Sequence, residues 1–156
     1  MNVEDLMRLA IEQARAGIAA GQTPFGCAIA IGDDVLAAAH NTVWATTDIT
    51  AHAEITTLRQ ACARAGRVHL VGAVVATTCE PCPMCMSALH WARVESVYYG
   101  ASIADAAAAG FNELGLSADE VVRQGGSSVT LSGGILTAEC VELFAHWRRT
   151  SKSRAY

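Results

Sequence analysis

The sequence predicts an α/β fold in which helices cover both faces of a central sheet. Apolar residues recur at helical spacing near the start of the chain, and short apolar runs further on are bounded by turn residues. Helical and extended segments alternate along the whole length, which is typical of this fold class. The 156 residues, 52% of them hydrophobic, are enough to bury a sizeable core, so we expect one domain spanning residues 1–156.

The first half of the chain predicts a helix, a hairpin and a second helix. Gly21 should end the first helix, and the turn of the hairpin falls at Gly32-Asp33-Asp34. Gly66 is suited to cap the second helix. The expected elements are a helix over about 2–20, strands over 27–31 and 35–39, a polar loop over 40–50, and a helix over about 52–65.

The second half predicts strands that alternate with short helices. A continuous apolar run over 71–78 has the composition of a strand that is buried on both faces of a sheet. Glycine pairs at 125–126 and 133–134 are expected to be hinges within the domain rather than boundaries. The further expected elements are a helix carrying Cys82 and Cys85, a strand over 96–99, short helices over 104–109 and 118–123, a strand over 129–131, and a closing helix over about 137–150.

A candidate metal site combines His52-Ala53-Glu54 with Pro81-Cys82-Pro83-Met84-Cys85. The three-residue spacing places Cys82 and Cys85 on one face of a first helical turn, where the helix dipole lowers the cost of holding thiolates. Two thiolates and one imidazole favour zinc, and three protein ligands leave a fourth position for a water whose pKa the metal lowers to about 7. We therefore predict one Zn²⁺ per chain on His52, Cys82 and Cys85, with Glu54 placed to move a proton of that water.

Two other interpretations of the cysteines are open. Cys79 can be the fourth ligand of a closed, structural zinc site in a protein that is not an enzyme. A thioredoxin-like redox pair is the second alternative. Neither interpretation gives a reason for an acid two residues beyond His52, so the sequence favours an enzyme.

The order H-x-E and then P-C-x-x-C is the signature of zinc nucleobase deaminases, and the chain resembles the cytidine deaminase superfamily. Over essentially its whole length it is similar to bacterial guanine deaminases within that superfamily. The similar segments are Pro24-Phe25-Gly26, Asn41, Thr50-Ala51-His52-Ala53-Glu54, Cys79-Glu80-Pro81-Cys82-Pro83-Met84-Cys85, Asp105 through Gly110-Phe111, Trp147-Arg148 and Tyr156.

This resemblance implies a fold and a reaction. The fold is a cytidine deaminase-like three-layer α/β/α sandwich with a mixed sheet and helices on both faces. The reaction is zinc-dependent hydrolysis of guanine to xanthine and ammonia. Cytosine, guanosine or a triazine are alternative substrates, and the middle motifs are shared with tRNA adenosine deaminases.

The resemblance also implies roles for individual residues. Glu113 would help to protonate the departing ammonia; this chain has Asn112-Glu113 where the family has two aspartates, so the acid reaches one methylene further. Asn41 offers a donor and an acceptor to the edge of a base, although a turn-forming asparagine is an equally good interpretation. Phe25 and Trp91 would sandwich the ring of the base, although single aromatics more often belong to the core. The other expected substrate-binding residues are Ala53 and Tyr156.

Charge and composition point to a small substrate. The net charge is −4, whereas proteins that grip a polynucleotide usually carry a basic face. We therefore expect a free nucleobase as partner and no nucleic acid. No apolar run is long enough to span a membrane, and no signal-peptide pattern is found. Six cysteines in such a chain indicate a reduced, cytoplasmic protein.

The polar tail after the closing helix would ordinarily fray. In guanine deaminases of this type, however, the closing helix is exchanged between two subunits and the terminal tyrosine covers the partner's active site. The glycine pairs can serve as hinges, and the apolar face of the closing helix must be buried. We therefore expect a homodimer in which residues from about 137 to 156 are swapped and Tyr156 is a lid in trans.

Overall fold

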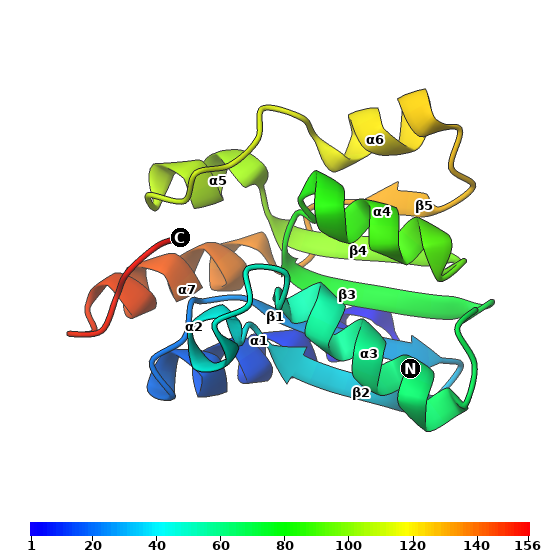
Figure 1. The fold of residues 1–156 in the computed structure, drawn as a ribbon, viewed down its shortest axis with the longest axis horizontal. Coiled ribbons are helices and arrows are strands. Elements are labelled where there is room, and N and C mark those ends of the chain that lie inside the picture. The colour runs from blue at the N-terminus through cyan, green and yellow to red at the C-terminus, as the bar shows by residue number, and fades with distance from the viewer.

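A five-stranded mixed sheet forms the middle layer of the computed structural model, which describes residues 1–156 (Figure 1). The spatial order is β2-β1-β3-β4-β5. β1 is antiparallel to both β2 and β3, whereas β3, β4 and β5 are parallel, so helices cross over between them. The strands are β1 (Gly26–Ile31), β2 (Asp34–His40), β3 (Ala73–Cys79), β4 (Ser96–Ala101) and β5 (Thr130–Ser132).

Helices cover both faces of this sheet, as the sequence predicts (Figure 1). α1 (Val3–Ala19) and α7 (Thr137–Arg148) pack on one face. α3 (Ala53–Ala65), α4 (Pro83–Trp91) and α6 (Ala118–Gly125) pack on the other. Two short helices, α2 (Val43–Thr46) and α5 (Ile103–Ala108), complete the fold. No helix has both the length and the apolar character needed to cross a membrane.

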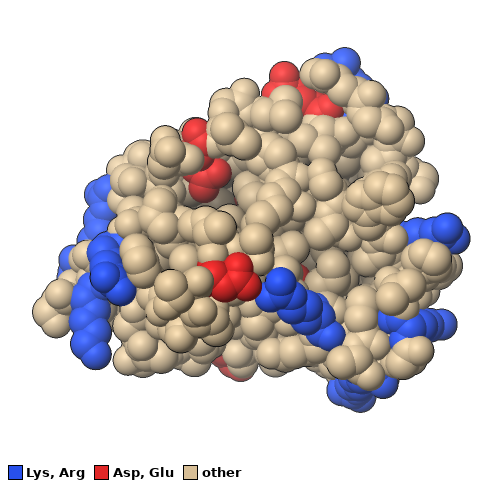
Figure 2. Space-filling view, viewed as in Figure 1, with Lys and Arg blue, Asp and Glu red and all other residues tan.

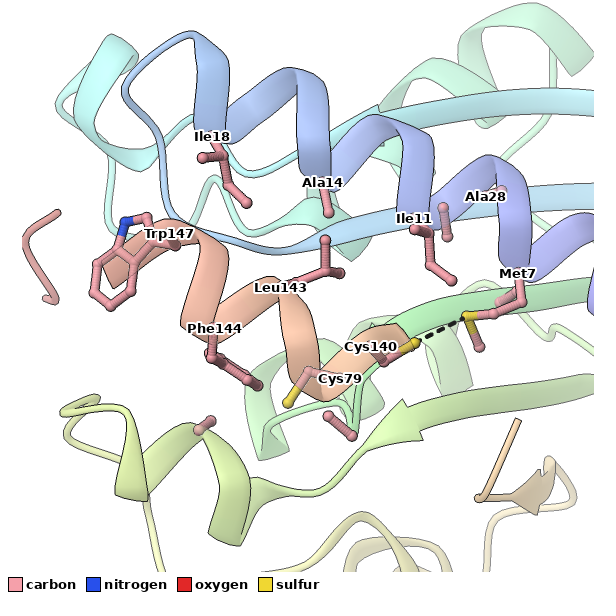
Figure 3. Packing of buried hydrophobic residues seen from close by; sticks show 14 of the residues in the cluster. Met7, Ile11, Ala14, Ile18, Ala28, Cys79, Cys140, Leu143, Phe144 and Trp147 are labelled. Atoms are coloured by element: carbon pink, nitrogen blue, oxygen red, sulfur yellow. Dashed lines mark hydrogen bonds between the residues drawn. The ribbon is translucent and has the colours of Figure 1, made fainter. Parts of the chain in front are cut away.

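Side-chain size differs between the two faces of the sheet. Along β1, Ile29 points toward α3 and α4, whereas Ala28 and Ala30 point toward α1 and α7. Because small residues line the α1 and α7 face, these helices lie close to the strands and to each other. Figure 3 shows side chains from α1 and α7 meeting over the sheet, with the Cys140 sulfur 3.9 Å from that of Met7.

Two glycines mark the closest approaches of helix to sheet. A Cβ on Gly26 of β1 would overlap the carbonyl oxygen of Ala10 in α1. A Cβ on Gly100 of β4 would overlap the sulfur of Cys140 in α7. Backbone and side chain therefore touch at these points with no room for another methyl group.

The structure differs from the sequence prediction mainly in the segment 40–50, which was expected to be a loop. It contains the single-turn helix α2, and the side chain of Asn41 starts it by accepting a hydrogen bond from the Val43 amide at 3.0 Å. The apolar face of α7 is buried within the chain itself, chiefly through Cys140, Leu143 and Trp147. Exchange of this helix between subunits remains a prediction.

The substitution Gly26→Ala should destabilise the fold by about 1–3 kcal/mol, because the added methyl group forces α1 away from β1. Denaturant unfolding measures this change. The control is Gly125→Ala at the end of α6, where open space surrounds the new methyl group. That variant should be more stable by about 0.4–1 kcal/mol. Equal stability of Gly26→Ala and the wild type would contradict the close approach.

Candidate metal centre and active site

Two helices begin at one end of the sheet and bring the predicted metal ligands together. His52 is the N-cap of α3, and Cys82 is the N-cap of α4. Both have extended backbones and neither side chain caps its own helix, so the imidazole and the thiol are free to face each other. Pro83 occupies the first position of α4, where its missing amide proton costs nothing. The site lies beyond the carboxyl end of β3, where open α/β sheets bind ligands.

The imidazole and two sulfurs form a compact donor group. Nδ1 of His52 lies 3.7 Å from the sulfur of Cys82 and 3.5 Å from that of Cys85. The three donor atoms are all within 4.8 Å of one another, so a metal ion can contact them together. One nitrogen and two sulfurs are a donor set that suits zinc. The chemistry and spacing of the group therefore fit the expected ion.

Cys79 lies outside this donor group. It ends β3, is buried, and its thiol points toward the carbonyl oxygen of Ser102 at 3.5 Å. Burial raises the pKa of the Cys79 thiol well above its usual value, and nearby carboxylates raise it further. Cys79 is therefore held as a neutral thiol that lines the cavity from the end of β3 without joining the donor group.

The two cysteines of α4 differ in their tendency to ionise. A hydrogen bond from Cys85, assisted by His52, lowers the pKa of the Cys82 thiol to about 4. The same bond and burial raise the pKa of Cys85. Burial acts to lower the pKa of His52, but Cys82 and Glu54 outweigh it and raise the pKa overall. The group thus carries a thiolate that faces an imidazole at the positive end of a helix.

Glu54 lies in the first turn of α3, against this donor group. The residue is only 7% exposed. Burial raises the pKa of the Glu54 carboxyl to about 7, and the charge of Cys82 acts in the same direction. A carboxyl with a pKa near neutrality can both accept and donate a proton.

Glu113 reaches the same cavity from the loop that joins α5 to α6. Burial raises the pKa of its carboxyl above the usual value, and the Cys82 thiolate adds to the effect. The cavity has a volume of about 20 Å³, room for roughly one water molecule. A larger hollow of about 320 Å³ adjoins it on the outer side and shares His52, Cys82, Glu113 and Tyr156.

Asn41 and Tyr156 form part of the cavity wall and contact each other. The amide nitrogen of the fully buried Asn41 donates a hydrogen bond to the Tyr156 hydroxyl at 2.7 Å, while its oxygen accepts one from Val43. The turn-forming role considered for Asn41 is therefore present, and one amide hydrogen remains for another partner. The Tyr156 ring lies 5.4 Å, centroid to centroid, from that of His52.

The chain end that carries Tyr156 is held by Trp44 of α2. The indole nitrogen of Trp44 donates to the carbonyl oxygen of Arg154 at 3.2 Å. The guanidinium of Arg154 lies 3.7 Å from the centre of the indole ring, a cation–π contact. Tyr156 thus covers the site of its own chain in this structure, and a lid in trans remains a prediction.

Most of the predicted site residues line this cavity; the exceptions are Cys85, which is fully buried but belongs to the donor group, and Trp91 and Ala53. Trp91 lies at the far end of α4 and is 77% exposed, so its predicted place against the substrate is wrong. It follows Cys85 by six residues, about 9 Å along the helix. Ala53, the first residue of α3, is fully buried in the core and does not line the cavity. The residues that do line it are Phe25, Asn41, His52, Glu54, Cys79, Glu80, Cys82, Glu113 and Tyr156.

Sequence reasoning missed Glu80, Trp44 and Thr23 near the site. Glu80 lines the cavity, although it appeared only as part of the cysteine motif. The buried hydroxyl of Thr23 makes no well-formed hydrogen bond. It lies close enough to Tyr156 to act against burial, which raises the pKa of that phenol. Nothing in the local sequence marks Trp44 or Thr23, because their partners lie more than a hundred residues away.

The chain is similar in sequence to proteins of known family. The model of the cytidine and deoxycytidylate deaminase zinc-binding region matches residues 1–101. A guanine deaminase from Bacillus subtilis is 42% identical over 114 residues, which are 72% of this chain and 73% of that protein. A tRNA-specific adenosine deaminase from Agrobacterium fabrum is 39% identical over 95 residues, 61% of this chain and 62% of that protein.

A solved structure described as guanine deaminase from Nitrosomonas europaea has the same arrangement over most of its length. It superposes with a TM-score of 0.86 at 28% identity and covers 96% of this chain and 86% of that one. The predicted three-layer fold with a mixed sheet is therefore confirmed. With the family model matched over residues 1–101 and the donor group in place, the chain belongs to the cytidine and deoxycytidylate deaminase family of zinc-binding proteins.

Proposed function

We propose that this protein hydrolyses the exocyclic amino group of a free nucleobase, with guanine converted to xanthine and ammonia. One observation carries the proposal: two carboxyl groups of raised pKa, Glu54 and Glu113, flank the imidazole–thiolate group in one small cavity. The choice of guanine is supported by the relative from Bacillus subtilis, a guanine deaminase.

The zinc ion would be held by His52 through Nδ1, by Cys82 and by Cys85. When bound, zinc supplies a Lewis acid that lowers the pKa of a water to about 7. The ion also opposes the effect of burial on nearby carboxyl groups, because a positive charge favours their ionised form. The helix starts of α3 and α4 contribute partial positive charge that stabilises the thiolates around it.

Glu54 is the group that moves protons. It accepts one proton from the attacking water and passes it to the ring nitrogen beside the carbon that bears the amine. A C–O bond forms and the C–N bond breaks; the amino group gains one proton and leaves as ammonia, while the new C–OH group loses the second proton of the water and becomes a carbonyl. The buried position of Glu54, away from bulk water, keeps that proton within the site.

Glu113 is placed to serve the leaving group. It approaches the donor group from the α5–α6 loop, opposite α3, and burial favours its protonated form. A protonated carboxyl can donate to the departing nitrogen, which makes ammonia a better leaving group. This role rests on the resemblance at Ala109-Gly110-Phe111, after which the family has acidic residues, and on the place of Glu113 at the cavity.

A second candidate function is deamination of adenosine in tRNA, because a relative of that activity matches at 39% identity. Two observations favour a free base. The net charge is −4, and on the face in Figure 2 the Lys and Arg side chains are scattered, mostly toward the edges, without forming a continuous basic surface. Tyr156 also lies over the cavity; a lid can close over a free base, whereas a base attached to a polynucleotide needs an opening through which its chain passes.

The substitution Glu54→Gln should retain one zinc per chain and lose about 100- to 10,000-fold in ammonia release. The measurement is ammonia released from a panel of guanine, cytosine, guanosine, a triazine and a tRNA stem-loop. Glu12→Gln, on the exposed side of α1, is the matched control and should keep wild-type turnover. We expect guanine to be the preferred substrate.

Two outcomes of this assay would contradict the proposal. Full activity of Glu54→Gln would remove Glu54 from the mechanism. Ammonia release from the stem-loop alone, falling steeply as salt is raised, would favour tRNA as the substrate.

The expected assembly is part of the same proposal. We propose a cytoplasmic homodimer in which two chains exchange residues from about 137 to 156, so that the contacts of Tyr156 form with the partner. Gly126 and Gly134 have positive φ angles and suit a hinge, and the apolar face of α7 provides contacts that would be the same in either arrangement. Six free cysteines agree with a reducing compartment.

Deletion of residues 152–156 should leave zinc content and the dimer intact and lower kcat/KM, because water then enters the site. Tyr156→Phe is the matched variant: it keeps the ring but removes the hydroxyl that Asn41 contacts. Unchanged kinetics in the truncated protein would show that the tail is an ordinary frayed end.

Mixed dimers decide whose site the tail covers. A chain that lacks residues 152–156 is refolded together with a Glu54→Gln chain. A swapped dimer then contains one complete site, so activity should rise well above that of either variant alone. A mixture with no gain would place the lid over its own chain and contradict the exchange.

A further inference from the structure

The carboxylate of Glu80 connects two helices that begin far from it in the sequence. Oε2 accepts a hydrogen bond from the Ile103 amide at 3.1 Å, and Oε1 accepts one from the Ala118 amide at 2.9 Å. Ile103 and Ala118 are the first residues of α5 and α6. One side chain therefore holds the beginnings of both helices.

The capping box at each helix start pairs other backbone amides and leaves these two without a partner in their own helix. Ser102 with Asp105, and Ser117 with Glu120, form capping boxes that satisfy the N-cap and third-residue amides. The amide of the first helical residue has no partner within the helix or the capping box. Glu80 supplies that partner to both helices, and its negative charge is favourable at two positive helix ends.

The segment between these helices carries the second carboxyl group of the site. Residues 109–117 run from the end of α5 to the start of α6 and include Phe111 and Glu113. No hydrogen bond holds the carboxylate of Glu113 itself, so its place over the donor group depends on how this loop is fixed. Phe111 anchors one part of the loop by stacking on Trp147.

Glu80 is also fixed with respect to the metal ligands. Its amide donates to the carbonyl oxygen of Ala101 at 2.8 Å, and only Pro81 separates it from Cys82. The backbone that carries Cys82 is thus joined, through one carboxylate, to the helices on both sides of the Glu113 loop.

We propose that Glu80 is a positioning residue that sets the distance and direction of Glu113 relative to the reacting carbon. This role rests on the proposed function of Glu113. Glu80 acts through two backbone amides, so neither proton transfer nor metal binding requires it directly. Misplacement of Glu113 by about 1 Å can cost up to about 100-fold in rate.

The variant Glu80→Gln tests this role with almost no change in shape. A glutamine has one oxygen and one amide group, so it can accept from only one of the two helix starts and presents N–H to the other. We expect zinc content to be unchanged, kcat to fall by about 10- to 100-fold, and KM to change little. Hydrogen–deuterium exchange should be faster in peptides covering residues 103–118. Glu80→Asp, one methylene too short to span both amides, should act the same way.

The control is Glu120→Gln, which weakens the capping box of the same helix α6 without touching the connection to Cys82. It should cost a similar amount of thermal stability and leave kcat close to wild type. An equal loss of kcat in Glu120→Gln would mean that helix stability, and not the Glu80 connection, governs the rate.

A double-mutant cycle with Glu113→Gln separates this proposal from the one on which it rests. If Glu80 acts through Glu113, the double variant should be no slower than Glu113→Gln alone. Multiplying losses, or unchanged exchange in Glu80→Gln, would overturn the positioning role. Wild-type turnover of Glu113→Gln would overturn the proposed role of Glu113, and with it the catalytic purpose of Glu80, even where exchange shows that Glu80 orders the loop.

Discussion

The structure depends on two helix starts that face each other at the carboxyl edge of the sheet. His52 and Cys82 are both N-caps, and Cys85 follows one turn later in α4, so three donor atoms meet within 4.8 Å. Holding ionised sulfur in a partly buried site is costly unless positive charge surrounds it. Free backbone amides at both helix starts and the imidazole provide that charge, which makes the placement of α3 and α4 the condition for any metal chemistry.

The packing of α1 and α7 on one face of the sheet affects the part of the site that Tyr156 covers. Small residues there, including Gly26 and Gly100, allow α1 and α7 to lie close to the strands. The same core cluster continues into Phe111 and reaches Tyr156, so the packing of α7 and the position of the lid belong to one body of side chains. Stability of the core and coverage of the cavity are therefore linked, whichever chain supplies the helix.

The sequence predicted those features that depend on local spacing. Cys82 and Cys85 share a helix turn, and His52 begins a helix, whatever surrounds them. Glu113, in contrast, was found only through the family resemblance. Trp91 was misplaced because a helix carries its last residue away from a site at its first turn. The role of Glu80 could not be predicted, because its hydrogen-bond partners lie 23 and 38 residues away in the sequence. The cysteine motif around Glu80 was also fully explained by metal binding. Helix α2 was missed because the Asn41 side chain starts it within a polar segment.

With His52, Cys82 and Cys85 as its only protein ligands, a bound zinc would keep one coordination position open. X-ray absorption spectroscopy of the zinc-loaded protein tests it most directly. Two sulfurs at about 2.3 Å and two lighter donors at about 2.0–2.1 Å, unchanged in Cys79→Ser, are the result expected from His52, Cys82 and Cys85. Three sulfurs around the zinc, with one lost in Cys79→Ser, would contradict this ligand set and indicate a closed structural site.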